Sequence, residues 1–62
     1  MDVAAWAALL RETEEHHAAY EAGAAPHQWS AWYAAYIVAR QSGRTAEAAA
    51  DDAARYVEAA QP

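Results

Sequence analysis

The sequence contains no cysteine, no lysine and no phenylalanine, and it has few large aliphatic residues. Without cysteine the chain has no disulfide and no thiolate ligand for a metal ion. Its strong cations are four scattered arginines, and the formal net charge is -5. Clustered cations are needed to neutralise nucleic-acid phosphates or to hold a protein on an anionic membrane. We therefore expect neither nucleic acid nor membrane as a partner. The lack of a long apolar run or a basic leader predicts a cytoplasmic protein.

Alanine makes up about a third of the 62 residues. It favours helix strongly but buries little area, so the aromatic residues, three Trp and four Tyr, must supply most of the hydrophobic stabilisation. So short a chain forms at most one small domain, residues 1–62, with a marginal core. We therefore expect self-association, with a homodimer as the first expectation.

The helical spacing of the apolar residues, with Gly and Pro at the boundaries between segments, predicts an all-α, three-helix bundle. The predicted helices span about residues 3–22, 26–42 and 46–60. Asp2 and Thr45 are suitable N-caps, and Pro26 suits the first turn of the second helix. Gly23 suits the left-handed position just past the first helix.

The first predicted helix is amphipathic. Its apolar stripe consists of Val3, Trp6, Leu10, Thr13, His17 and Tyr20. At 100° per residue, Glu14 and Glu21 fall on or beside this stripe, whereas Glu12 and Glu15 are predicted to point away.

The second predicted helix carries one broad aromatic face. That face consists of Trp29, Trp32, Tyr33, Tyr36, Ile37 and Arg40. A guanidinium on such a face needs an acidic partner or a cation–π contact. The third predicted helix has a narrow stripe of small residues, which allows close approach to its neighbours, and an exposed Asp51–Arg55 pair.

A candidate metal site lies where the first two helices should face each other. Its four candidate ligands are Glu14, His17, Glu21 and His27. Glu and His three residues apart project the same way from a helix, as in carboxylate-bridged di-iron and di-manganese bundles. Oxygen and nitrogen ligands without thiolate suit Zn, Fe, Mn or Ni. One chain holds only one such motif, so a di-metal site would need a homodimer.

Two other interpretations of the same residues stay open. In the first, no metal binds, and Glu14 and Glu21 accept hydrogen bonds from Arg40, from Trp indoles and from Tyr hydroxyls. In the second, the aromatic residues clamp a flat or cationic small molecule. The candidate ligand-binding residues are Trp29, Trp32, Tyr33, Tyr36, Arg40 and Tyr20. Glu14, Glu21 or His17 could act as a general base, so enzymatic activity is left open.

Two runs, HAAYE from His17 to Glu21 and APHQWSAWYAAYIVAR from Ala25 to Arg40, resemble a short helical segment of actinobacterial proteins. In some of these it is a tail on a glyoxalase/bleomycin-resistance (vicinal oxygen chelate) domain, and in others it stands alone. That domain does not fit in 62 residues, so its metal and substrate residues are not carried over. The resemblance covers about residues 9–57. It implies only that seven residues act as one unit: His17, Glu21, His27, Trp29, Trp32, Tyr36 and Arg40.

Three functions are therefore expected as candidates. The first is a small helical binding or interaction module with a buried Glu/His/Arg polar cluster. The second is a metal-binding protein, with or without enzymatic activity. The third is a protein that binds a small molecule in an aromatic pocket.

Overall fold

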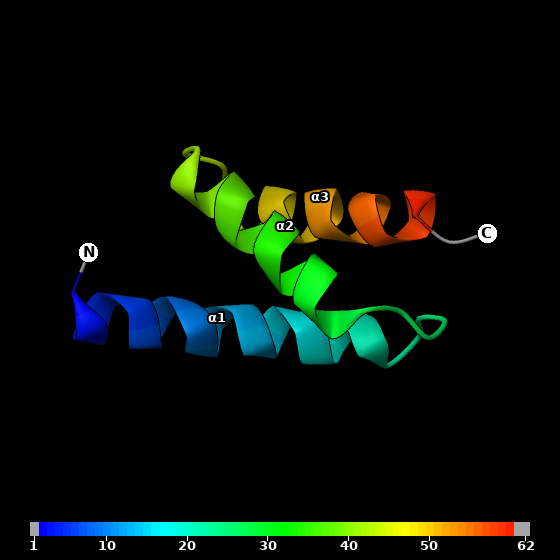
Figure 1. The fold of residues 1–62 in the computed structure, drawn as a ribbon, viewed down its shortest axis with the longest axis horizontal. Helices are drawn as coiled ribbons and strands as arrows, with labels where there is room; N and C mark the ends of the chain where they lie inside the picture. The colour runs from blue at the N-terminus through cyan, green and yellow to red at the C-terminus, as the bar shows by residue number, and fades with distance from the viewer. Residues whose placement is uncertain (1, 61–62) are drawn as a thin grey trace.

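The computed structural model describes residues 2–60, most of which lie in three α-helices (Figure 1). The helices are α1 (Val3–Glu21), α2 (Trp29–Gln41) and α3 (Ala46–Ala59). α1 and α3 run in nearly the same direction, and α2 crosses obliquely between them (Figure 1). Residues 2–60 contain no strand, so the all-α, three-helix prediction is confirmed. None of the helices in this range has the length and apolar character needed to cross a membrane.

The N-caps of α1 and α3 are as predicted. Asp2 Oδ1 accepts a hydrogen bond from the Ala5 amide at 2.8 Å, and Thr45 Oγ1 accepts one from the Ala48 amide at 3.1 Å. Each cap satisfies an amide that has no carbonyl partner inside its helix.

α2 begins at Trp29, so the prediction that it starts at Pro26 is wrong. The backbone of Gln28 is extended, with φ -77° and ψ 111°, and its side chain forms no cap. The ring of His27 hydrogen-bonds back to the Ala25 carbonyl, which holds this stretch in a non-helical connection. The three residues excluded from α2 thus place the His27 side chain beside α1.

The two glycines behave differently. Gly43 has φ 93°, and the amides of Gly43 and Arg44 bond to the carbonyls of Arg40 and Ala39, as in a Schellman motif. Gly23 does not have a positive φ, so the prediction of a left-handed residue after α1 is wrong. α1 ends instead through ordinary turn hydrogen bonds, such as the one from the Gly23 amide to the Tyr20 carbonyl.

The hydrophobic core lies mainly between α2 and α3. It consists of Trp32, Tyr36, Ala39, Ala49, Ala53 and Val57. The rings of Trp32 and Tyr36 stack with their centroids 5.4 Å apart, and both side chains are fully buried. The small residues of α3 let this helix approach the two large rings closely, as the sequence predicted.

α1 packs through only part of its predicted stripe. Thr13 and His17 are buried as expected, but Val3, Trp6 and Leu10 are exposed. The side chains of α1 that turn inward along its middle are Leu9, Glu12, Thr13, His16, His17 and Tyr20. The first turns of α1 extend past the other two helices (Figure 1), so no described element covers the N-terminal part of the stripe.

Candidate metal centre

His17 and His27 bring two imidazole rings together at one end of the bundle. The two Nε2 atoms lie 3.0 Å apart, although one ring belongs to α1 and the other to the connection before α2. The side chain of Glu21 lies one helical turn after His17. One donor atom from each of these three residues falls within 4.8 Å of the others. Within residues 2–60 no other three His or acidic side chains converge in this way. We call His17, Glu21 and His27 the histidine site.

The outer nitrogens of both rings face acceptors. His27 Nδ1 lies 3.0 Å from the Ala25 carbonyl oxygen, and because a carbonyl only accepts, this nitrogen carries the hydrogen. His17 Nδ1 lies 3.7 Å from Glu21 Oε1, which is too far for a hydrogen bond. Because His27 carries its hydrogen on Nδ1, His27 Nε2 accepts the 3.0 Å hydrogen bond between the rings and His17 Nε2 donates it.

Aromatic side chains hold the two imidazoles in place. The ring of His17 contacts Trp32 and Tyr33, with centroid distances of 5.1 and 5.2 Å. The ring of His27 contacts Tyr20 at 5.1 Å. His17 is only 6% exposed. Packing therefore fixes the orientation of both rings, so the two Nε2 atoms are already placed to share one ligand.

The histidine site fits a transition-metal ion. Two imidazole nitrogens bound to one tetrahedral ion, each at about 2.0–2.1 Å, lie about 3.3 Å apart. The observed 3.0 Å needs an opening of only a few tenths of an ångström. Glu21 is half-exposed and supplies a carboxylate that can turn towards such an ion. Glu14, the fourth ligand candidate, is exposed and lies outside the group of three.

Arg40 has an acidic partner, but the partner is Glu12, not Glu14 or Glu21. Arg40 Nε donates to Glu12 Oε2 at 2.8 Å, and the hydroxyl of the buried Tyr36 donates to the same oxygen. We call Glu12, Tyr36 and Arg40 the carboxylate triad. The prediction that Glu12 points away from the other helices is wrong, because the inward face of α1 is rotated relative to the apolar stripe.

The carboxylate triad shifts the ionisation of its members. Hydrogen bonds from Arg40 and then Tyr36 lower the pKa of Glu12. Burial and then the Glu12 carboxylate raise the pKa of Tyr36 well above its ordinary value. The hydrogen bond to Glu12 also raises the pKa of Arg40. Glu12 therefore stays ionised and fixes α2 to the middle of α1.

The remaining polar candidates have other partners. The Tyr20 hydroxyl donates to Glu58 on α3 at 2.8 Å, and burial followed by this bond raises the pKa of Tyr20. Trp32 Nε1 is buried without a hydrogen-bond partner in residues 2–60, so the expected indole-to-carboxylate bond does not form there. On α3, Arg55 pairs with Asp52 rather than with Asp51. The spacing of residues in the sequence did not predict Glu58 as the partner of Tyr20 or Asp52 as the partner of Arg55.

Comparison with known protein families, curated proteins and solved structures found no match for this chain. The resemblance to the actinobacterial helical segment stays a prediction, and no residue role is taken from it. Functional inference therefore depends on the geometry of the side chains alone.

Proposed function

We propose that this chain is a small helical metal-binding protein whose histidine site holds one divalent transition-metal ion, with Zn²⁺ as the first candidate. The observation that carries the proposal is the 3.0 Å approach of His17 Nε2 and His27 Nε2, with Glu21 completing a group of three donor atoms within 4.8 Å of one another. Metal-bound histidines characteristically donate their outer N–H to a carboxylate or a backbone carbonyl. His27 Nδ1 forms such a bond with the Ala25 carbonyl.

A metal ion held between the two Nε2 atoms would replace the hydrogen of the bond that joins them, and the hydrogen of His17 would move to Nδ1. The hydrogen bond alone leaves the Glu21 carboxylate with no role beyond its contact with His17 Nδ1. A divalent ion engages all three side chains and leaves an open coordination position, as zinc sites with three protein ligands do. Two imidazoles and one carboxylate suit Zn²⁺, Fe²⁺, Mn²⁺ or Ni²⁺, the metals expected from the sequence.

The test is isothermal titration of ZnCl₂ into tag-free protein, with circular dichroism to show that each variant is folded. We expect one ion per chain for the wild type. Loss of a residue that hydrogen-bonds to a metal ligand typically weakens metal binding 10–100-fold. His27→Ala removes a ligand itself, so it should weaken binding by about 100-fold or more. His27 is only partly buried and lies outside the helices, so this variant should fold.

The matched control is His16→Ala. His16 precedes His17 on α1, but its ring stacks on Tyr36 with centroids 5.5 Å apart and lies outside the histidine site. Zinc affinity should be unchanged in this variant. A folded His27→Ala protein with wild-type affinity, or the absence of stoichiometric binding by the wild type, would refute the proposal.

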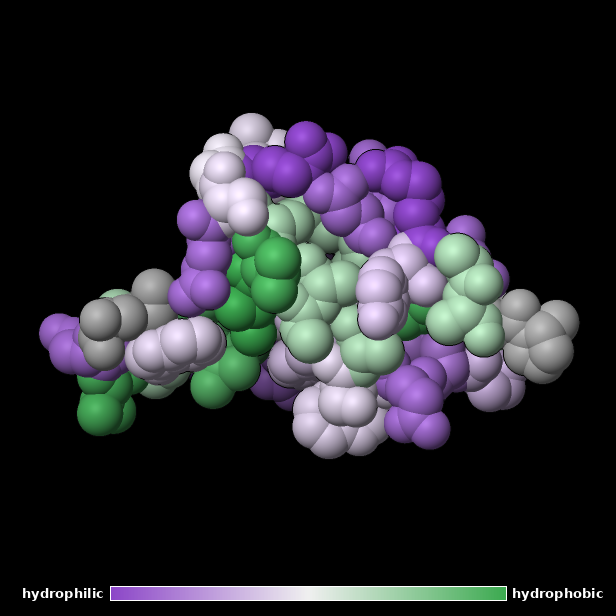
Figure 2. All heavy atoms as spheres, turned by 45° about the horizontal axis from the view of Figure 1, so that its top comes forward, coloured by the Kyte–Doolittle hydropathy of each residue, from purple (hydrophilic) through white to green (hydrophobic). Residues whose placement is uncertain are grey.

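A second candidate, association with another copy of the chain, is favoured by the uncovered apolar surface. Val3, Trp6 and Leu10 are 86, 38 and 46% exposed. A groove of about 500 Å³ between α2 and α3 is lined by four alanines with Val38, Ser42 and Tyr56, and by the paired Arg44 and Asp52. Figure 2 shows a green apolar band across the visible face, with purple polar side chains above it. We call Val3, Trp6 and Leu10 the α1 ridge. If the ridge of each copy packed into the groove of the other, the two chains would form a closed dimer with a larger core.

Sedimentation velocity over a range of protein concentrations tests this association. We expect a concentration-dependent dimer in the wild type and a monomer in Trp6→Ser. An exposed residue outside the ridge and groove, as in Glu15→Ser, provides the control. A monomeric wild type at every concentration would rule out the association without affecting the metal proposal.

A further inference from the structure

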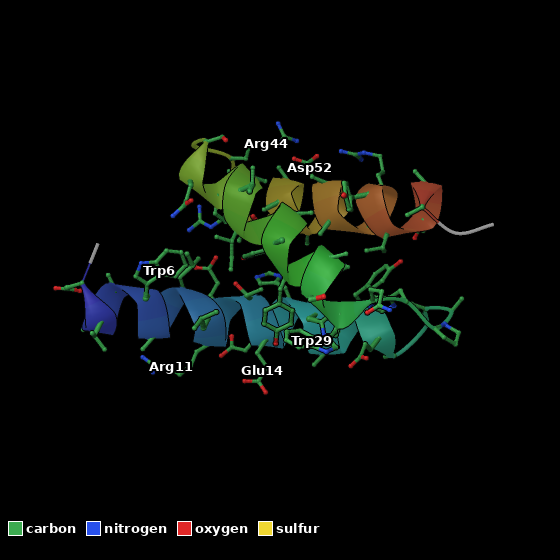
Figure 3. All side chains as sticks on the ribbon, in the orientation of Figure 1. Trp6, Arg11, Glu14, Trp29, Arg44 and Asp52 are labelled. Carbon is green, nitrogen blue, oxygen red and sulfur yellow. The ribbon has the colours of Figure 1, made fainter. Side chains whose placement is uncertain are left out.

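A cleft of about 350 Å³ opens beside the histidine site, between α1 and the start of α2. Its lining residues are Glu14, His17, Ala18, Glu21, Trp29 and Tyr33. Figure 3 shows Glu14 and Trp29 next to each other near the crossing of α1 and α2. We call this feature the acidic cleft. Its volume lies within the range of small-ligand sites.

One wall of the acidic cleft is aromatic. The rings of Trp29 and Tyr33 meet edge to face, with centroids 5.4 Å apart and an interplanar angle of 88°. Trp29 is 62% exposed, so most of this large side chain is not used in the core. Aromatic faces carry negative potential and attract cations.

The other wall carries two carboxylates, Glu14 and Glu21, placed two turns apart on α1. No arginine lines the cleft. Arg40 pairs with Glu12, and Arg44 and Arg55 pair with Asp52. Within residues 2–60 Glu14 forms no ion pair, and the only ion-pair partner of Glu21 is His17.

The two carboxylates and the two aromatic rings line the same cleft. Two independent features, the aromatic rings and the carboxylates, therefore favour positive charge in the same space.

We propose that the acidic cleft binds a small guanidinium compound, with the planar cation against Trp29 and its N–H groups directed to Glu14. A guanidinium both stacks on aromatic rings and forms paired hydrogen bonds with carboxylates, so it matches both walls. A hydrated inorganic cation would use only the carboxylates. The proposal goes beyond metal binding and concerns the metal-free protein, because the cleft shares His17 and Glu21 with the histidine site and a metal ion there would repel the guanidinium.

The test uses ¹H–¹⁵N NMR of the protein in EDTA, titrated with N-ethylguanidinium and separately with N-ethylurea. The two probes have nearly the same shape, but only the first is charged. We expect saturable shift changes for the Trp29 indole N–H and the Ala18 amide with ethylguanidinium alone. Equal changes with ethylurea at the same concentrations would overturn the proposal.

Two glutamate variants provide the second readout. Glu14→Gln should weaken ethylguanidinium binding by about fivefold or more, since it removes a charge from the cleft. Glu15→Gln removes the same charge from an exposed neighbour that does not line the cleft, and binding should not change. Equal affinities in the two variants would contradict the proposal. Because EDTA removes free metal, failure here is distinguishable from failure of the zinc titration.

Discussion

Replacing Glu12 by alanine tests how the carboxylate triad holds α1 against α2. The change leaves the hydroxyl of the fully buried Tyr36 without its acceptor, which costs about 1–3 kcal/mol. It also breaks the ion pair with Arg40, but both side chains are about a third exposed, so solvent screens the contribution of this pair. The expected loss of unfolding free energy is therefore about 1–3 kcal/mol. For a domain of this size, Tm should fall by about 4 °C or more.

Thermal and urea denaturation followed by circular dichroism measure this loss. Glu15→Ala is the matched control, because Glu15 is exposed on the same helix, and its stability should stay within about 0.5 kcal/mol of wild type. Tyr36→Phe should cost less in the Glu12→Ala background than in wild type, since the hydroxyl has already lost its partner. Equal Tm values for Glu12→Ala and Glu15→Ala would refute the reasoning.

Three further predictions concern acid stability, glycine conformation and core packing. Because the pKa of Glu12 is lowered in the folded protein, its carboxylate stabilises the fold fully above the usual pKa of 4.5. This stabilisation is lost as the pH falls through the pKa that Glu12 has in the folded protein. The stability gap between wild type and Glu12→Gln should therefore narrow in acid melts, and a constant gap would contradict this. Gly43→Ala should lower the unfolding free energy by about 1 kcal/mol because Gly43 has φ 93°, whereas Gly23→Ala should be neutral or stabilising. Equal shifts of the urea midpoint in the two variants would disprove this contrast. Ala53→Leu should overpack the core and destabilise the protein by about 1–3 kcal/mol or more, whereas Ala59→Leu, at an exposed position, should leave stability unchanged. Equal Tm values for the two variants would be inconsistent with the close α2–α3 contact.

The class of fold could be predicted because its signals are local. Asp2 and Thr45 are N-caps by their own chemistry, and the small residues of α3 define its buried stripe without knowledge of the other helices. The start of α2 could not be predicted in the same way. Pro26 is compatible with a first helical turn, and only the contact of the His27 ring with the Ala25 carbonyl places that stretch outside the helix.

The partner of Arg40 could not be predicted because it depends on how α1 is rotated. Leu9 and Leu10 are adjacent, so hydropathy alone allows either to face inward. The structure turns Leu9 inward, which also brings Glu12 to Tyr36 and Arg40 and leaves Leu10 exposed. The grouping of His17, Glu21 and His27 was accessible from the sequence, because the first two share a helix face and a short connection limits the reach of His27.

The measurement that most directly tests the metal proposal is ¹⁵N NMR of the histidine rings during addition of one equivalent of zinc. The chain has three histidines, and His16 lies outside the histidine site as an internal control. Metal binding predicts a large change at Nε2 of both His17 and His27, with Nδ1 of His27 still protonated and His16 unaffected. Unchanged Nε2 signals for His17 and His27, or an equal response from His16, would contradict it.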